Sequence, residues 1–355
     1  MNRMENWQEG MRGMKVGVIG DFCLDRNNQY NNTKLKSLEY DAVPIERNLN
    51  PDTEFAPGGA GNVAVNFRKL GANVITFGVR GMDFASLYLM HLFGQQGIQH
   101  FGLIPDRMGK TPRYEKFYLQ DKENKSQTKR LDTYNDNPVS LGIQQILLDV
   151  LRRELKYLSA VYIADQIPTE HNPCITPYLR ENLEKILSET GVPVMVDSRE
   201  RTREWIKSGF ILKPNQKEIW EDYGNAEEFI MNRISEDESM KELFEDCTQE
   251  FLNRSNSPFM YVTLHDRGAV LFQKNSQPIY IPTLPFENGD PTGCGDALGS
   301  ASLTALVVGE TPLEAAKFGN AAAYHTIQQI GGCGMPTLEE LFKNYGTIYE
   351  YGKWW

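Results

Sequence analysis

Cysteine is scarce in this sequence, and the few cysteines form no recognisable pattern. Five occur in 355 residues, none of them in a CxxC pair: Cys23, Cys174, Cys247, Cys294 and Cys333. Their odd number and wide spacing argue against the even disulfide framework that small secreted proteins use. The simplest interpretation is a set of reduced thiols, which predicts a cytoplasmic protein.

Long hydrophobic runs and an excess of positive charge are also missing. The apolar run at residues 16–19 is too short for a signal peptide, and no run approaches the roughly 18 residues of a membrane span. Lysine and arginine total 37 against 47 aspartates and glutamates, so the formal net charge is −10. Such an acidic chain is a poor partner for nucleic acid or for an anionic membrane. We therefore expect a small-molecule partner, with no nucleic acid and no membrane.

A Walker-type GxxxxGK[ST] loop is absent, but residues 290–296, Asp-Pro-Thr-Gly-Cys-Gly-Asp, are a different candidate for anion binding. The small residues that follow predict a glycine turn opening a buried helix. The amides of Gly293, Cys294 and Gly295 would then point outward at the positive end of the helix dipole, where anions bind. Asp296 could deprotonate a hydroxyl while these amides hold a transferring phosphoryl group. An ordinary turn capped by aspartate is the alternative interpretation.

A second glycine-rich segment, Gly-Gly-Ala-Gly-Asn at residues 58–62, leads into a helix that ends near Gly71. From Gly59 onward it matches GxGxxA, so the dinucleotide site of a dehydrogenase is one alternative. A dinucleotide fingerprint should follow a buried strand, however, and here a proline directly precedes the first glycine. We expect instead that Gly58 and Gly59 bring the backbone close to a ligand, to which Asn62 offers its amide.

Apolar runs that end in a polar residue alternate with helical patterns along much of the chain. Asp21, Asp165, Asp197 and Asn215 end or follow four such runs, which lie at residues 15–20, 160–165, 192–197 and 211–215. This alternation predicts an α/β fold with a parallel, doubly wound sheet and a site along one edge. Asp21 and Asp25 could grip sugar hydroxyls together, because charged acceptors bind neutral hydroxyls strongly. A single polar residue at a strand end is usually only a turn residue, so the prediction depends on their convergence.

Two segments interrupt this rhythm. In residues 111–132, aromatic and charged side chains are interleaved without a helical period, which predicts a hairpin that forms a small antiparallel flap outside the central sheet. The flap could be a lid that excludes water and pairs with a second subunit, or a solvated insertion without a role. Residues 225–257 are rich in glutamate and lack glycine, which predicts inserted surface helices.

Taken together and in this order, the motifs resemble the ribokinase or phosphofructokinase-B family of sugar kinases, from about residue 15 to residue 341. Residues 58–62 are similar to the family's sugar-binding segment, and residues 290–296 to its catalytic Asp-Thr-x-Gly-Ala-Gly-Asp. The resemblance implies a ribokinase-like three-layer αβα sandwich with a mostly parallel doubly wound sheet and a small β-sheet lid. The kinase domain would span residues 15–345, with a lid from about 26–57 and 108–133, an N-terminal extension at 1–14 and an aromatic tail at 346–355.

The resemblance also implies a role for individual residues. Asp296 would be the base, and Gly293, Cys294 and Gly295 the anion hole. The sugar would be held by Asp21, Asp25, Gly58, Gly59, Asn62 and Asp165, and the nucleotide by Asn215, Glu218, Thr263, Gly268, Thr292 and Asn320. The implied cofactors are ATP and Mg²⁺, which Glu218 would hold through water, and K⁺ is a further candidate, beside Asp290 and the loop at 331–334. A homodimer through the β lid is the expected assembly.

Within the family, residues 20–26, 39–44, 57–64, 130–132 and 320–323 resemble the bacterial heptose 7-phosphate kinase group. The chain departs from that pattern after Asp165, where a lysine and a glycine are missing, and at 197–199, where Asp-Ser-Arg replaces Asp-Pro-Lys. These departures leave a heptose phosphate, a hexose and a nucleoside open as substrates, and a non-catalytic sugar-binding protein as an alternative. A substrate phosphate could be held by Arg113, Lys116, Arg199, Arg201 and Arg203, although arginines on a solvated helix are common.

Overall fold

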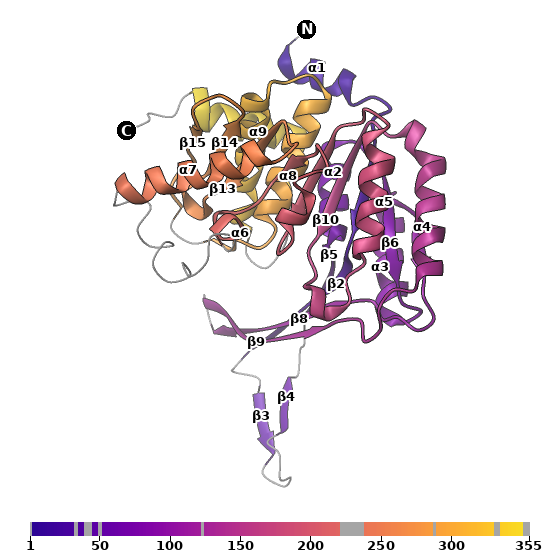
Figure 1. Ribbon diagram of the computed structural model, residues 1–355. Coiled ribbons are helices and arrows are strands. Elements are labelled where there is room, and N and C mark those ends of the chain that lie inside the picture. The colour runs from indigo at the N-terminus through magenta and orange to yellow at the C-terminus, as the bar shows by residue number, and fades with distance from the viewer. Residues whose placement is uncertain are drawn as a thin grey trace.

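A computed structural model describes the protein at residues 2–31, 35–38, 45–48, 52–121, 124–220, 238–286, 289–329 and 334–350. Within these ranges the strands form a large central sheet, a four-stranded lid and a separate hairpin (Figure 1). Among the described helices, none combines the length and the apolar character that a membrane crossing requires.

The central sheet has nine described strands in the order β15-β14-β13-β12-β11-β10-β1-β6-β7. Seven of them run parallel: β1 (Lys15–Gly20), β6 (Asn73–Arg80), β7 (Gln99–Pro105), β10 (Ala160–Asp165), β11 (Val194–Ser198), β12 (Ile211–Leu212) and β13 (Phe259–Thr263). Antiparallel strands β14 (Ala269–Gln273) and β15 (Ile279–Ile281) close one edge. The predicted doubly wound, mostly parallel sheet is confirmed.

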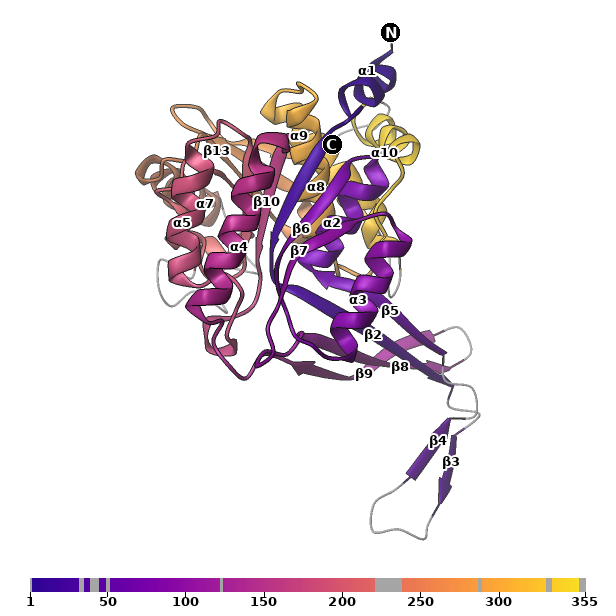
Figure 2. The same ribbon diagram turned by 90° about the vertical axis from the view of Figure 1, so that its right-hand side faces the viewer.

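Helices cover both faces of the sheet, as Figure 2 shows. One face carries α2 (Ala60–Leu70), α3 (Phe84–Gln95), α8 (Cys294–Val307), α9 (Pro312–Ile327) and α10 (Leu338–Tyr345), which pack into one hydrophobic cluster. The other face carries α4 (Leu141–Glu154), α5 (Pro177–Ser188), α6 (Gln216–Trp220) and α7 (Glu238–Arg254), with a cluster of their own. The three-layer αβα sandwich is therefore confirmed, with an apolar core on each side of the sheet.

The lid lies at the carboxyl edge of the parallel strands and has the order β5-β2-β8-β9. Its strands are β2 (Phe22–Asn31), β5 (Asp52–Gly59), β8 (Arg113–Asp121) and β9 (Asn124–Thr133). The β8–β9 hairpin is antiparallel as predicted, but β2 pairs parallel with β8, so the lid is a mixed sheet. A second hairpin, β3 (Leu35–Leu38) with β4 (Ile45–Asn48), is drawn beyond the lid.

The ends of the chain and the acidic insertion also differ from the simple expectation. The N-terminal extension contains α1 (Arg3–Gly10), whose Trp7 is buried and whose Arg3 forms ion pairs with Glu310 and Glu314. Residues 225–237 of the predicted surface insertion lie outside the described part of the chain. The helix that follows, α7, buries Phe244 and Leu252 completely, so it is a core helix on its inner side. Of the aromatic tail, residues 346–350 form a short helical turn, and 351–355 lie outside the described residues.

Candidate active site

A cleft of about 690 Å³ lies between the carboxyl edge of the sheet and the lid. Its walls come from segments that are far apart in the sequence. The residues that line it and that the sequence had singled out for catalysis or binding are Asp25, Gly58, Gly59, Asn62, Asn215, Glu218, Thr263, Gly268, Thr292, Gly293, Cys294, Gly295, Asp296 and Asn320. One continuous surface therefore brings together most of the predicted sugar, phosphate and nucleotide contacts.

The turn at residues 290–296 has the predicted form. Gly293, at φ 81°, is the N-cap of α8, and Asp296 lies in the first turn of that helix. The Cys294 amide donates to the Pro291 carbonyl at 3.2 Å, so this amide is not the outward-facing donor that was predicted. The amides of Gly293 and Gly295 remain as candidates for the anion hole, at the positive end of the α8 dipole.

Asp296 is held by two side-chain amides at the floor of the cleft. Asn62 donates its Nδ2 proton to Oδ2 at 2.6 Å, and Gln166 donates its Nε2 proton to Oδ1 at 3.0 Å. Burial, followed by the nearby Asp197 carboxylate, raises the pKa of Asp296 from 3.8 to about 6, while both amide donors act in the opposite direction. A carboxylate with such a pKa is ionised at neutral pH and can accept a proton from a hydroxyl.

Asp25 and the two glycines form the sugar end of the cleft. A Cβ on Gly58 would lie 2.1 Å from Asp25 Oδ1, and Gly59 has a positive φ of 55°, so both positions require glycine. Lys116 Nζ lies 3.5 Å from Asp25 Oδ2, and both residues are buried. Among the described residues Asp25 Oδ1 has no hydrogen-bond partner. It is therefore a buried acceptor that a ligand hydroxyl could satisfy.

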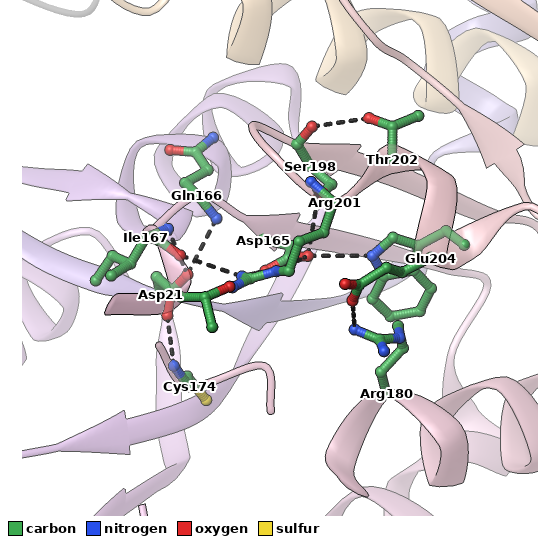
Figure 3. Close-up of polar contacts among 12 residues, drawn as sticks. Asp21, Asp165, Gln166, Ile167, Cys174, Arg180, Ser198, Arg201, Thr202 and Glu204 are labelled. Carbon is green, nitrogen blue, oxygen red and sulfur yellow. Dashed lines mark hydrogen bonds and ion pairs between the residues drawn. The ribbon is translucent and has the colours of Figure 1, made fainter. Parts of the chain in front are cut away.

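Asp21 does not belong to this surface, and its predicted contact with sugar is corrected. Its carboxylate is 2% exposed and accepts three backbone N–H bonds, from Gln166 at 3.0 Å, Ile167 at 2.9 Å and Cys174 at 2.7 Å (Figure 3). Asp21 is not among the described residues that line the cleft. It fixes the loop after β10 instead of facing a ligand.

Asp165 is likewise a structural residue. It forms a buried ion pair with Arg201 and accepts hydrogen bonds from Ser198 Oγ at 2.8 Å and Trp205 Nε1 at 3.1 Å (Figure 3). This pairing removes Asp165 from the predicted sugar contacts and Arg201 from the candidate phosphate ligands. Arg113 and Arg203 are not among the described cleft residues either, whereas Lys116 and Arg199 are.

The predicted nucleotide end begins where β12 leads into α6. Asn215 and Glu218 cap each other: Asn215 donates its backbone N–H and its Nδ2 proton to the Glu218 carboxylate, and Glu218 N donates to Asn215 Oδ1. Burial and the neighbouring Asp197 raise the pKa of Glu218 to about 8. Lys213 lies beside them, buried, with Nζ 3.0 Å from Asp197 Oδ2.

The described residues contain no group of three or more histidine, cysteine, aspartate or glutamate side chains that could hold a metal alone. Mg²⁺ usually needs only one or two carboxylates, with water and substrate phosphates completing its octahedron. Glu218, whose oxygens already accept protein N–H bonds, fits a role through water. Asp290 accepts an N–H bond from Thr292, and residues 331–333 of the predicted K⁺ site lie outside the described residues.

The far end of the cleft contains Gly268 and Asn320. Gly268 has a φ of 88°, and a Cβ there would meet the Ile281 carbonyl at 2.1 Å. Asn320 donates through Nδ2 to the Pro282 carbonyl and to Tyr349 Oη, each at 2.8 Å. The predicted contact of Asn320 with adenine therefore does not use its donor, which is engaged within the protein.

The cleft also contains residues that had no assigned role in the sequence. They are Tyr114, Arg130, Gln166, Lys213, His265, Asp266, Phe286, Gly289, Leu298, Ala323 and Ile327. One signal was available for Tyr114: residues two apart on a strand share a face, so Lys116 and Tyr114 should point the same way. No comparable signal was available for Gln166. It follows Asp165, and the structure shows that Asp165 pairs with Arg201 inside the protein and does not line the cleft.

A sheet of this topology, with a glycine turn and a carboxylate at its carboxyl edge, belongs to the class of α/β phosphotransferases that lack a Walker loop. The sequence profile of the pfkB family of carbohydrate kinases matches residues 29–338. The chain belongs to this family and is a carbohydrate kinase.

Individual relatives agree with the family assignment. The chain is 27% identical over 337 residues to the bifunctional protein HldE of Photobacterium profundum, covering 94% of this chain and 64% of that protein. The HldE protein of Geotalea uraniireducens is 26% identical over 90% of this chain and 61% of its own length. The chain thus spans less than two thirds of these curated relatives.

Solved structures show the same fold at low identity. Arabidopsis thaliana ribokinase complexed with ribose and ATP superposes with a TM-score of 0.67 at 20% identity, over 94% of this chain and 98% of that one. Phosphofructokinase-2 from Escherichia coli in complex with potassium gives a TM-score of 0.70 at 16% identity, over the same shares of the two chains.

Proposed function

We propose that the protein transfers the γ-phosphoryl group of ATP to a hydroxyl of a sugar that already bears a phosphate, of the heptose 7-phosphate type. The observation that carries this proposal is the arrangement of Asp296 and Asp25 in one cleft, with Asn62 hydrogen-bonded to Asp296. One carboxylate would activate the attacking hydroxyl, and the other would bind the sugar.

The chain's residues divide the reaction between them. Asp296 accepts the proton of the attacking hydroxyl, and the amides of Gly293 and Gly295 stabilise the charge on the phosphoryl group. Asp25 Oδ1 accepts a hydrogen bond from a further sugar hydroxyl, and the lid strands shield the reacting atoms from water. Mg²⁺, when bound, would neutralise charge on the nucleotide phosphates near Asn215 and Glu218.

The preference for a phosphorylated sugar depends on basic side chains at the lid end of the cleft. Lys116 and Arg130 come from the lid, and Arg199 follows β11. Lys116 is buried, and its ammonium is only loosely paired with Asp25 at 3.5 Å. A second anion near Lys116 would pair with its ammonium group. A phosphate on the substrate would supply that anion, which supports a phosphorylated sugar as the substrate.

Three alternatives are weaker. The GxGxxA segment follows β5, a strand of the lid, whereas a dinucleotide fingerprint follows a strand of the central sheet, which disfavours a dehydrogenase. A kinase for an unphosphorylated sugar or a nucleoside would leave Lys116 and Arg199 without an anionic partner from the substrate. A non-catalytic sugar-binding protein would have no need of the two amides that hold Asp296.

The direct test measures ADP release with a panel of hexoses, hexose phosphates, nucleosides and 7-phosphorylated heptose. We expect phosphorylated sugars to have the highest kcat/KM. Lys116→Met should raise the KM for them at least roughly tenfold, since a charge-assisted contact is lost. Lys110→Met is the matched control, because Lys110 is half exposed and pairs with Asp136 outside the cleft. Equal activity on unphosphorylated sugars, or no ADP release with any sugar, would reject the proposal.

We also propose a homodimer through the lid, because β5 and β9 are its edge strands in the described part of the chain, and the lid adjoins exposed apolar side chains. Phe55 of β5 contacts Phe84 and Tyr88 of α3, and Phe84 is 60% exposed. Light scattering should therefore give the mass of a dimer for the wild type and of a monomer for Phe84→Asp. A monomeric wild type at micromolar concentration would contradict this assembly.

A further inference from the structure

The loop between β10 and α5 provides a contact with the catalytic carboxylate that the sequence did not reveal. Gln166, the first residue after β10, reaches Asp296 across 130 positions of sequence and donates to Oδ1 at 3.0 Å. Asn62 donates to the other oxygen at 2.6 Å. The two amides therefore approach the carboxylate through different oxygen atoms and together define its orientation.

The position of Gln166 is itself fixed by buried charges. Its backbone N–H donates to the carboxylate of Asp21. The same carboxylate accepts the N–H of the adjacent Ile167 and, at the far end of the loop, the N–H of Cys174. Figure 3 shows the main-chain nitrogen of Gln166 facing Asp21 and its side chain directed away. The Asp165–Arg201 pair anchors the preceding residue, and Arg201 also donates to the Ile167 carbonyl at 3.1 Å. The main chain that carries Gln166 is therefore held in place on both sides.

We propose that Gln166 is a positioning residue for the catalytic base, holding Asp296 in one orientation and in its ionised form, and that Asp21 acts through this loop. The inference rests on the proposed function, in which Asp296 receives the proton of the substrate hydroxyl. With one oxygen bound to each amide, the carboxylate has fixed lone pairs to offer to that hydroxyl. Gln166 thereby takes part in the reaction without touching the reacting atoms.

Several charged and titratable groups surround Asp296, and a substitution at Gln166 removes none of them. Asp197 of β11 disfavours the ionised carboxylate, and Lys213 after β12 favours it. Tyr162 of β10 and Cys294 of α8 also lie within its electrostatic reach. A hydrogen bond to the ionised form lowers a carboxyl pKa, so loss of the Gln166 amide should raise it.

The test compares the pH dependence of kcat in the wild type and in Gln166→Met, which keeps the length of the side chain but cannot donate. We expect the acidic limb to move up by about one pH unit, with an unchanged KM for ATP. Gln166→Asn, whose amide is too short to reach, should behave in the same way and serves if the methionine variant folds poorly. Asn172→Gly is the matched control: it removes a hydrogen bond of the same loop, to the Asn135 carbonyl, and keeps its left-handed backbone. It should leave the acidic limb in place.

A second readout does not depend on activity. In protein labelled with ¹³C-aspartate, the carboxyl resonance of Asp296, assigned by its loss in Asp296→Asn, should titrate about one unit higher in Gln166→Met than in the wild type. An identical titration in both proteins would overturn the role of Gln166. If no sugar is phosphorylated, the proposed function fails, while this comparison still decides whether Gln166 keeps Asp296 ionised.

Discussion

The ionised carboxylate of Asp296 should lower the stability of the folded protein. Burial raises its pKa from 3.8 to about 6. At about 1.4 kcal/mol per pKa unit, the charge disfavours the folded state by about 3 kcal/mol at neutral pH. Asp296 is only partly buried in an open cleft, so solvent screening reduces the expected destabilisation to about 1–2 kcal/mol. Asp296→Asn should therefore be inactive and yet more stable than the wild type.

The sign and the pH range follow from the same shift. Well below about pH 4 the carboxyl is protonated in both the folded and the unfolded chain, so the variant has no stability advantage over the wild type. The stability advantage of the variant should grow between about pH 4 and pH 6 and level off above about pH 7, where the folded carboxylate is almost fully charged. The partly buried Gln166 carboxamide can rotate about its terminal bond and present its oxygen to the new amide, which limits the loss of hydrogen bonds.

The assay is urea unfolding followed by circular dichroism between about pH 4 and pH 8. Asp266→Asn is the matched control, because Asp266 lines the same cleft but is exposed, and its unfolding free energy should follow that of the wild type. A destabilising charge on Asp296 would be contradicted if the unfolding free energy of Asp296→Asn differs from that of the wild type by the same amount at every pH, or if the variant is the less stable protein above pH 6.

Three further changes test other parts of the structure. Arg201→Met leaves Asp165 charged and buried, so urea unfolding should show a loss of about 3–5 kcal/mol in the free energy of unfolding. Adding Asp165→Leu to this variant should partly restore the stability, and an Arg201→Met protein as stable as the wild type would contradict the expectation. Tyr349→Phe removes a partner of the Asn320 amide, so steady-state kinetics should give a roughly threefold higher KM for ATP and an unchanged KM for the sugar. Glu218→Gln should raise the Mg²⁺ concentration needed for half-maximal rate at fixed ATP, and an unchanged Mg²⁺ titration would remove Glu218 from the metal site.

The parts that the sequence predicted best are those whose chemistry is local. The glycine turn before Asp296 and the segment before Asn62 each combine backbone freedom with a polar side chain within a few residues. Both were therefore readable as ligand sites, and the structure joins them by a hydrogen bond. The alternation of apolar runs and helices likewise predicted the sheet, because it reflects burial along single segments.

The parts that the sequence could not predict depend on contacts between distant segments. Asp21, Asp165 and Asn215 look equivalent as polar residues at strand ends, but only Asn215 lines the cleft among the residues described. What separates them is the partner each one meets: Asp21 binds an amide 153 positions away, and Asp165 pairs with Arg201. The parallel pairing of β2 with β8 and the buried side of α7 are also properties of the assembled fold.

We propose that Asp296 removes the proton from a sugar hydroxyl in the cleft, and the turnover of Asp296→Asn measures this role. With the best substrate of the panel at saturating ATP, we predict a loss of kcat of about 10²–10⁴-fold, with dissociation constants for ATP and sugar changed less than about threefold. Turnover within a few-fold of the wild type would contradict the assignment of Asp296 as the base.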